Sequence, residues 1–299
     1  MAMEKDSFSF RVGDYECTAV CDGFHAYTEP VSLLFPGVPS ESLEQVLSKH
    51  NLQPGQWEEF VSPYICLLVS TGDNLVLIDT GAGPDLGPDT GKLLQRLEAL
   101  GVSPGDIGIV VLTHGHPDHI GGNTTGGMEP AFPNARYVMC KDEWDFWTSG
   151  KLAAEELARL ELGEEFTQVL PQIAQKNLLP IKDQLELVEK DTEITPGIQV
   201  VVTPGHTPGH LMVIIASKGE QLFYISDAFI HPVHLERPDW HMAVDLYPGQ
   251  NVSTRRQILE RAANEKALVH AFHFPFPGIG YVVQEEQGWR WQPVSEHSI

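Results

Sequence analysis

Three histidines and an aspartate lie within the seven residues 113–119, which read THGHPDH. The segment follows an apolar run at 107–112, which is typical of a short buried β-strand. Neutral imidazole nitrogen and carboxylate oxygen are the non-thiolate ligands that zinc prefers. A solvated histidine-rich loop is the alternative interpretation, but this segment is internal and follows a buried strand. The pattern therefore predicts a metal site where the strand ends.

Three further strand ends carry side chains of the same kind. His206 lies within TPGHTPGH, Asp227 lies within SDA, and His273 begins HFPFPG, each just past an apolar run. One polar residue at one strand end would be unremarkable. Because active sites of α/β proteins gather at strand ends, the recurrence predicts that all four junctions meet in one site.

Seven candidate ligands follow from these junctions: His114, His116, Asp118, His119, His206, Asp227 and His273. Seven are too many for one tetrahedral ion, but they suit two ions that share a bridging carboxylate and a bridging water. We expect His114, His116 and His206 to hold the first ion.

The second ion is expected to bind Asp118, His119 and His273, with Asp227 as the bridge between the two ions. Two neighbouring divalent cations lower the pKa of a shared water toward neutrality and polarise a carbonyl or phosphoryl oxygen. The predicted chemistry is therefore hydrolysis by a metal-bridging hydroxide.

Two more polar residues are expected to support the ligands. Asp79 ends the apolar run 75–78, where a lone carboxylate is costly unless it is hydrogen-bonded or close to positive charge. A role beside the metal ligands would meet that need, and an Asx turn that braces the loop is the alternative. His210 closes TPGHTPGH and is expected to orient the loop that carries His206.

Candidate substrate-pocket residues follow the bridging aspartate and the last histidine: His231, His234, Trp240, His241, Phe274 and Phe276. For the aromatic ones, a position in the core is an equally good interpretation. We expect Trp144 and Trp147, three residues apart, to lie in the core. Four histidines outside these groups are interpreted as ordinary: His25, His50, His270 and His297.

The elements that must position these residues form two halves, each with strands followed by helices. This order predicts an α/β (α+β) fold with two facing sheets and helices outside. We expect a single domain over residues 1–299, with 22–60 as an extended N-terminal segment whose one regular element is a helix at 41–50. That segment could be a lid, a dimer surface or a structural strap. A homodimer would cover its apolar side chains.

Composition excludes several classes of partner. The net charge is −22, with 41 acidic against 19 basic residues, so no basic footprint for nucleic acid or anionic membranes is present. The chain has no apolar run of bilayer length and no signal-peptide pattern at its start. Its four cysteines form no CxxC pair, which favours free thiols in a reducing compartment. We therefore expect a cytoplasmic protein that acts on a small molecule.

The motifs HxHxDH, the preceding LIDTG, and the following TPGHTPGH, SDA and late histidine resemble the metallo-β-lactamase fold superfamily of hydrolases over most of residues 61–285. The Asp227 bridge and the HFPFPG segment look like the methyl parathion hydrolase and quorum-quenching lactonase branches. The resemblance implies a four-layer αββα sandwich of mixed sheets and two divalent ions, zinc first, then manganese, cobalt or iron. It also implies hydrolysis of a neutral lactone, carboxylic ester or phosphotriester, in which Asp118 passes a proton to the leaving group.

The position three residues after the bridging aspartate departs from both of those branches. The lactonases have a tyrosine three residues after the bridging aspartate, where this chain has Ile230. The parathion hydrolases have a histidine there, and the nearest histidine here is His231. Two alternative functions stay open: an iron-dependent redox enzyme of the persulfide dioxygenase type, since iron accepts the same ligands, and a non-catalytic metal-stabilised binding scaffold. Structural zinc sites are normally closed, which argues against the scaffold.

Overall fold

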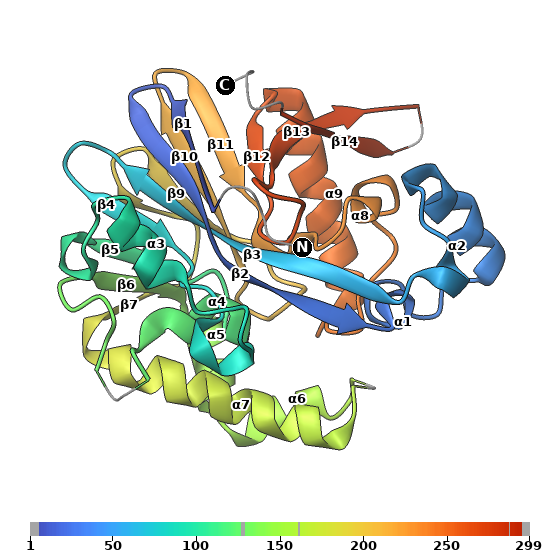
Figure 1. The fold of residues 1–299 in the computed structure, drawn as a ribbon, viewed down its shortest axis with the longest axis horizontal. Helices are drawn as coiled ribbons and strands as arrows, with labels where there is room; N and C mark the ends of the chain where they lie inside the picture. Colours follow the sequence, from blue (N-terminus) through green and yellow to red (C-terminus); the bar gives the residue numbers. More distant parts are fainter. Residues whose placement is uncertain (1–5, 127–128, 161, 287, 295–299) are drawn as a thin grey trace.

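Two mixed β-sheets face each other in the computed structural model, which describes residues 6–126, 129–160, 162–286 and 288–294 (Figure 1). The first sheet contains, in spatial order, β1 (Ser7–Val12), β2 (Tyr15–Thr28), β3 (Glu59–Ser70), β4 (Leu75–Ile78), β5 (Ile109–Val111), β6 (Arg136–Cys140) and β7 (Leu185–Val188). Its strands are antiparallel from β1 to β4 and parallel from β4 to β7.

The second sheet is built from the later part of the chain. It contains β8 (Thr192–Thr195), β9 (Ile198–Val202), β10 (Leu211–Ser217), β11 (Glu220–Tyr224), β12 (Leu268–His270), β13 (Ile279–Gln284) and β14 (Trp289–Pro293). Only β11 and β12 pair in parallel among these described strands. The two mixed sheets confirm the predicted sandwich.

Helices cover the outer faces of both sheets (Figure 1). The helices of the described part of the chain are α1 (Pro30–Leu34), α2 (Ser40–Leu47), α3 (Leu93–Ala99), α4 (Pro117–Ile120), α5 (Lys141–Thr148), α6 (Lys151–Leu157), α7 (Glu164–Leu178), α8 (Val233–Glu236) and α9 (Pro248–Glu265). Helix α3 packs on β2, α5 on β6 and β7, and α9 on β13. Of the helices in the described part of the chain, none combines the length and apolar character that a bilayer crossing requires.

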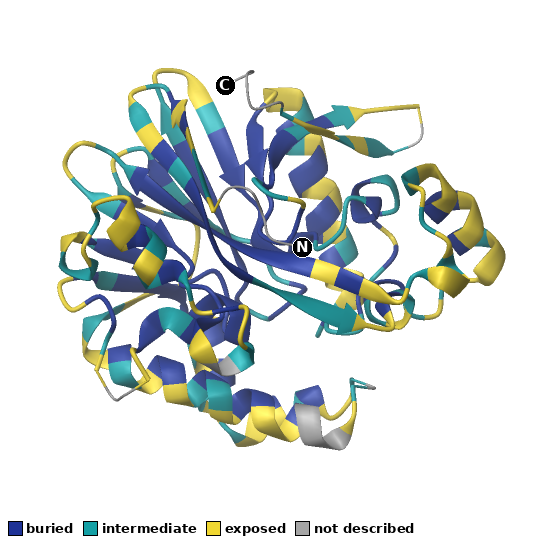
Figure 2. Cartoon of the chain, viewed as in Figure 1, coloured by how far each residue is buried: buried dark blue, intermediate teal, exposed yellow. Residues whose placement is uncertain are grey.

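The main core lies between the sheets, as the buried colouring of the strands in Figure 2 shows. Strand β10 illustrates how the sequence builds it, because alternate residues of a strand face opposite sides. Leu211, Val213 and Ile215 belong to the core between the sheets, whereas Met212 and Ile214 belong to the cluster that includes α9. All four cysteines are buried free thiols, as predicted.

The segment 22–60 contains more regular structure than the sequence indicated. Strand β2 continues to Thr28 past a bulge between Cys21 and Gly23, and β3 already begins at Glu59. The expectation of a single helix is therefore wrong, because the bulge bends the strand and interrupts its alternating pattern. Gly23 is required at the bend: its φ is 157°, and a Cβ would lie 2.0 Å from the carbonyl oxygen of Asp89.

The apolar side chains of this segment are covered within the chain. Leu34, Phe35 and Leu47 pack with Val233 and Trp240 in a third buried cluster. This removes the reason for expecting a second copy of the chain to cover the segment. The homodimer, the cytoplasmic location and the boundaries of the domain stay predictions.

Candidate metal centre

The strand ends of the two sheets bring the seven predicted ligands together. His114, His116, His206 and Asp227 place ligand atoms within 4.8 Å of one another, and so do Asp118, His119, Asp227 and His273. The first sheet contributes the segment after β5, which runs into α4, and the second contributes the residues that follow β9, β11 and β12. The two groups share Asp227, which lies in a 3-10 turn at Ser226–Ala228.

The first group has the donor chemistry that a cation requires. The Nδ1 atom of His116 lies 3.0 Å from the Nε2 atoms of both His114 and His206. A hydrogen bond to His116 Nδ1 can satisfy only one of these two contacts well, so one pair of ring nitrogens is left facing each other without a well-aligned proton between them. Burying such a pair is costly unless a cation lies between the nitrogens. This group therefore fits a divalent ion.

The second group contains polar atoms without a partner. His119 Nε2 and Asp227 Oδ1 face each other at 3.1 Å, and both are buried without a hydrogen bond among the described residues. The other oxygen of Asp227, Oδ2, lies 3.2 Å from His273 Nε2 and 3.5 Å from His206 Nε2. Because its two oxygens face different histidines, Asp227 has the geometry of a bridging ligand.

Electrostatics favours the ligand form of two of the histidines and of the bridging aspartate. Burial lowers the pKa of His114 and His116 well below the usual value, so both imidazoles are neutral and keep a lone pair. Burial also opposes the charge on His119, but the carboxylates of Asp227 and Asp79 outweigh it and raise its pKa. Burial of Asp227 is outweighed in turn by His273 and His119, which hold the carboxylate pKa well below its usual range. The carboxylates around His119 thus attract positive charge to this site, which suits a cation.

Asp79 lies beside the second group, at the end of β4. Its Oδ2 atom accepts a hydrogen bond from His119 Nδ1 at 2.8 Å and another from the Tyr224 hydroxyl at 2.9 Å. Oδ1 accepts the backbone N–H of Thr113 at 2.8 Å. Since His119 donates through Nδ1, Nε2 is the ring nitrogen that faces the ligand group. Asp79 thus orients a predicted ligand through hydrogen bonds to a neighbouring strand end, whereas an Asx turn would bond within its own loop.

His210 lies beside the bridging aspartate. Its Nδ1 atom is 2.9 Å from Thr203 Oγ1, and its Nε2 atom accepts the backbone N–H of Asp227 at 3.2 Å. Burial lowers the pKa of His210 to about 3, so the ring stays neutral and can accept that bond. His210 therefore fixes the turn that carries Asp227.

Two partners of the ligand histidines were missed by the sequence analysis. Asp245 Oδ1 lies 2.9 Å from His206 Nδ1, and Ser62 Oγ lies 2.7 Å from His273 Nδ1. Asp245 also faces the buried guanidinium of Arg255, at 3.4 Å. Asp245 sits in an irregular loop without a motif. Ser62 gave a usable signal, because it is a buried hydroxyl near the start of the apolar strand β3.

Glu143, on α5, was also missed. Its carboxylate accepts the backbone N–H of Gly115 at 2.8 Å, that of Gly209 at 2.9 Å, and the indole N–H of Trp147 at 2.6 Å. It therefore ties together the loops that carry His116 and His206. Trp147 is fully buried in the core, as predicted, and its ring lies 5.5 Å from that of His116.

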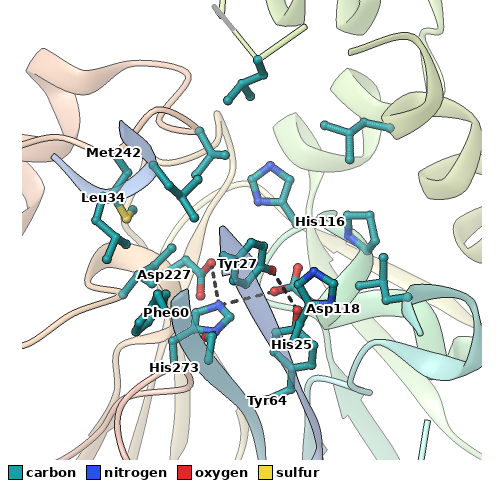
Figure 3. Close-up of a pocket in the computed structure, with 18 of the residues that line it drawn as sticks. His25, Tyr27, Leu34, Phe60, Tyr64, His116, Asp118, Asp227, Met242 and His273 are labelled. Carbon is teal, nitrogen blue, oxygen red and sulfur yellow. Dashed lines mark hydrogen bonds and ion pairs between the residues drawn. The ribbon is translucent and has the colours of Figure 1, made fainter. Parts of the chain in front are cut away.

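A cavity of about 510 Å³ opens onto the ligand groups at His116, Asp118, Asp227 and His273 (Figure 3). Most of its remaining wall is apolar, and it is formed by Leu33, Leu34, Phe60, Leu86, Leu157, Leu160, Leu162, Val169, Leu170, Ile173, Ile230, Met242 and Val244. The other polar lining residues are His25, Tyr27, Thr28, Ser62 and Tyr64. Among the described residues that line it, none is a lysine or arginine.

The predicted pocket residues His231, His234, Trp240, Phe274 and Phe276 do not line this cavity. His234 bonds to the backbone oxygen of Leu34 at 3.0 Å, and Trp240 packs on Phe35 with ring centres 5.4 Å apart. His231 packs in the same region, with its ring 5.6 Å from that of Trp57. These side chains lie behind the cavity wall, where they support the segment 22–60.

The other two aromatic residues that were predicted to line the pocket, Phe274 and Phe276, lie in different surroundings. Phe274 is buried against Trp291, with ring centres 5.0 Å apart, and Phe276 packs against the main core. His241 is half-buried and is likewise not among the lining residues.

His25, which the sequence analysis treated as ordinary, does line the cavity. It shares a face of β2 with Tyr27, two residues later, so the alternation of the longer strand would have indicated it. His50 bonds to Glu236 at 2.7 Å, and His270 stacks on Tyr224. His297 lies outside the described residues.

Comparison with known proteins gives a family match over residues 62–273, to the metallo-beta-lactamase superfamily. An N-acyl homoserine lactonase of a Bacillus species is 26% identical over 265 residues, which cover 79% of this chain and 87% of that protein. A probable metallo-hydrolase of Mycobacterium tuberculosis is 28% identical over 217 residues, 65% of this chain and 66% of that one.

Solved structures extend the likeness over nearly the whole chain. The dizinc quorum-quenching lactonase AidC, in complex with a product, is 28% identical, with a TM-score of 0.88 over 97% of this chain and 99% of that one. The hydrolase AbOPH, described as belonging to the beta-lactamase superfamily, is also 28% identical, with a TM-score of 0.87 over 98% and 99% of the two chains.

Proposed function

The chain belongs to the metallo-β-lactamase superfamily, and from this premise we propose that it is a metal-dependent hydrolase that cleaves a neutral lactone or carboxylic ester. Two divalent ions, zinc by preference, would be held by His114, His116, Asp118, His119, His206, Asp227 and His273. The observation that carries the proposal is that both ligand groups open, through His116, Asp118, Asp227 and His273, onto a largely apolar cavity. A structural metal site would be closed, whereas this one is open to a ligand-sized space.

When bound, two such ions would activate a water molecule shared between them and polarise the carbonyl oxygen of the substrate. The protein would supply the rest of the chemistry. Asp118 lines the cavity, with Oδ2 at 3.4 Å from His273 Nε2. Because a carboxylate has two oxygens, Asp118 could bind through one and carry a proton to the leaving oxygen with the other.

The cavity wall supports a neutral, partly apolar substrate. An anionic group would find no lysine or arginine among the described lining residues and would meet the carboxylates of Asp118 and Asp227. An apolar chain attached to the ester would be buried against leucine and isoleucine side chains of α6, α7 and the loop after α6. The lactonase relatives act on molecules of this type, which adds to the case for a lactone.

The test is elemental analysis combined with hydrolysis of a small panel. An N-acyl homoserine lactone, an aryl ester and an aryl phosphotriester are followed by proton release in a pH-stat. We expect about two zinc, manganese or cobalt ions per chain and turnover of the lactone or the ester. Chelation should abolish turnover and zinc should restore it.

Other results would contradict the proposal. Iron without hydrolysis would favour the redox alternative, and tightly bound metal without turnover of any panel member would favour the scaffold. Hydrolysis that survives complete metal removal would show that the ligand groups do not carry the reaction.

A further inference from the structure

Two tyrosine hydroxyls meet at the metal end of the cavity. Tyr27 comes from β2 and Tyr64 from β3, and their hydroxyl oxygens are 2.8 Å apart. Both side chains line the cavity together with Asp118 and His273, and Figure 3 shows the four around one space. The Tyr64 ring lies 5.6 Å from the His273 ring. The hydroxyl pair is therefore close enough to the ligand groups to reach a substrate bound there.

Both phenols keep their protons. A phenol has an ordinary pKa of about 10, and burial raises the pKa of both Tyr27 and Tyr64 further. Each hydroxyl is therefore a neutral group with one proton to donate and lone pairs to accept. A neutral donor suits an oxygen atom on which negative charge develops during ester cleavage.

The surroundings of the two hydroxyls determine which proton is free. Tyr64 is fully buried, and among the described residues its hydroxyl has a hydrogen bond only to Tyr27. Tyr27 is half-buried and borders the open space of the cavity. Because a buried hydroxyl proton without an acceptor is costly, the arrangement in which Tyr64 donates to Tyr27 is favoured, and this arrangement leaves the proton of Tyr27 for the cavity. Accepting a bond also makes Tyr27 a stronger donor.

His25, whose ring lies 4.7 Å from that of Tyr27, also lines the cavity, and few other donors lie near this point. Ser62 is engaged with His273 Nδ1 at 2.7 Å, and Ile230, three residues after Asp227, places an apolar side chain in the wall. We propose that the Tyr27 hydroxyl donates a hydrogen bond to an oxygen of the scissile ester group and that Tyr64 positions it. This inference rests on the proposed hydrolase function and names a catalytic residue for it.

Three substitutions test the proposal, each of which removes only a hydroxyl: Tyr27→Phe, Tyr64→Phe and Tyr15→Phe. Tyr15 is the matched control, because its hydroxyl donates to the Pro196 carbonyl on the outer part of the molecule. Metal content, melting temperature, kcat and KM are measured on the panel member that the wild type turns over best, and rates are expressed per bound metal. Affinity for the ring-opened or acid product is measured by calorimetry.

We expect Tyr27→Phe to lose about tenfold or more in kcat/KM, as for the loss of one donor to a developing oxyanion. It should also bind the product more weakly, with metal content and melting temperature unchanged. Tyr64→Phe should lose less, because Tyr27 keeps its own proton, and Tyr15→Phe should match the wild type.

Two results would overturn the role of Tyr27 and leave the proposed function standing. They are a wild-type kcat/KM in Tyr27→Phe, or a larger loss of kcat/KM in Tyr64→Phe than in Tyr27→Phe. Absence of turnover by the wild-type protein on every panel member would instead overturn the proposed function, and the role of Tyr27 would fall with it.

Discussion

Asp245 offers a sharp test of how the ligand histidines are supported. Its fully buried carboxylate binds His206 Nδ1 at 2.9 Å, the backbone N–H of Met242 at 3.0 Å, and the Arg255 guanidinium at 3.4 Å. Asp245→Asn keeps the shape and can still accept from His206. It removes the negative charge, however, so the buried Arg255 loses its counter-ion.

The magnitude follows from the burial of both partners. Breaking a buried ion pair by removing one charge costs about 3–5 kcal/mol. At roughly 2 °C per kcal/mol for a chain of this size, the melting temperature should fall by about 6–10 °C. Because the imidazole of His206 also loses a charged partner, metal affinity should fall about tenfold or more.

The pH dependence has a definite sign. Arg255 and the bond from His206 outweigh burial and hold the pKa of Asp245 below its usual value. Its contribution to stability is therefore complete above the pKa of an unfolded aspartate, about 4, and is lost as the pH falls through the folded pKa. The stability difference between wild type and Asp245→Asn should be constant at neutral pH and shrink in acid.

Calorimetric melting and chelator competition measure the two effects. Asp239→Asn is the matched control, because Asp239 pairs with Arg237 at 2.9 Å while both side chains are more than a third exposed. An exposed pair of this kind contributes about 0–1 kcal/mol. Melting temperatures of the two variants within one or two degrees of each other (roughly 1 kcal/mol) would refute the assignment of Asp245 and Arg255 as a stabilising buried pair.

Three further substitutions probe other parts of the site. Asp118→Asn should reduce kcat by about a hundredfold or more while the protein stays folded, and unchanged kcat would remove Asp118 from proton transfer. Ser62→Ala takes the hydroxyl from His273 Nδ1 and should weaken binding of one of the two ions about tenfold in a chelator titration, whereas equal loss of both ions would contradict a local effect. Gly115→Ala places a Cβ 2.3 Å from Trp147 Cδ1 and should cost about 1–3 kcal/mol in urea unfolding, while Gly105→Ala, whose Cβ meets Asn134 only at 3.4 Å, should cost much less.

The ligand positions could be predicted because each depends on local sequence. An apolar strand followed by a histidine or aspartate is visible within a few residues, and the sandwich then brings the strand ends together. The partners of these ligands could not be found in this way. Asp245 is 39 residues from His206, and Ser62 is 211 residues from His273, so no short motif connects them.

The residues of the cavity wall could not be predicted from short stretches of sequence, for a different physical reason. His231, His234 and Trp240 follow the bridging aspartate closely, but α1 and α2 pack over them and turn them into core. Much of the true wall comes from β2, β3, α1, α6 and α7, whose side chains reach the cavity only after the layers assemble. The bulge in β2 had the largest effect on the prediction, because the strand continues past it and brings His25 and Tyr27 to the cavity.

The two sheets are formed by consecutive stretches of chain, β1 to β7 ending at Val188 and β8 to β14 beginning at Thr192. Neither stretch contains a complete ligand group. The first stretch supplies His114, His116, Asp118 and His119, and the second supplies His206, Asp227 and His273. Each ion would therefore bind side chains from both halves of the molecule and hold them together. If the chain were cut in the exposed turn at 189–191, bound metal ions would help to hold the two fragments together. We therefore expect the association of the two fragments to strengthen as the metal concentration rises.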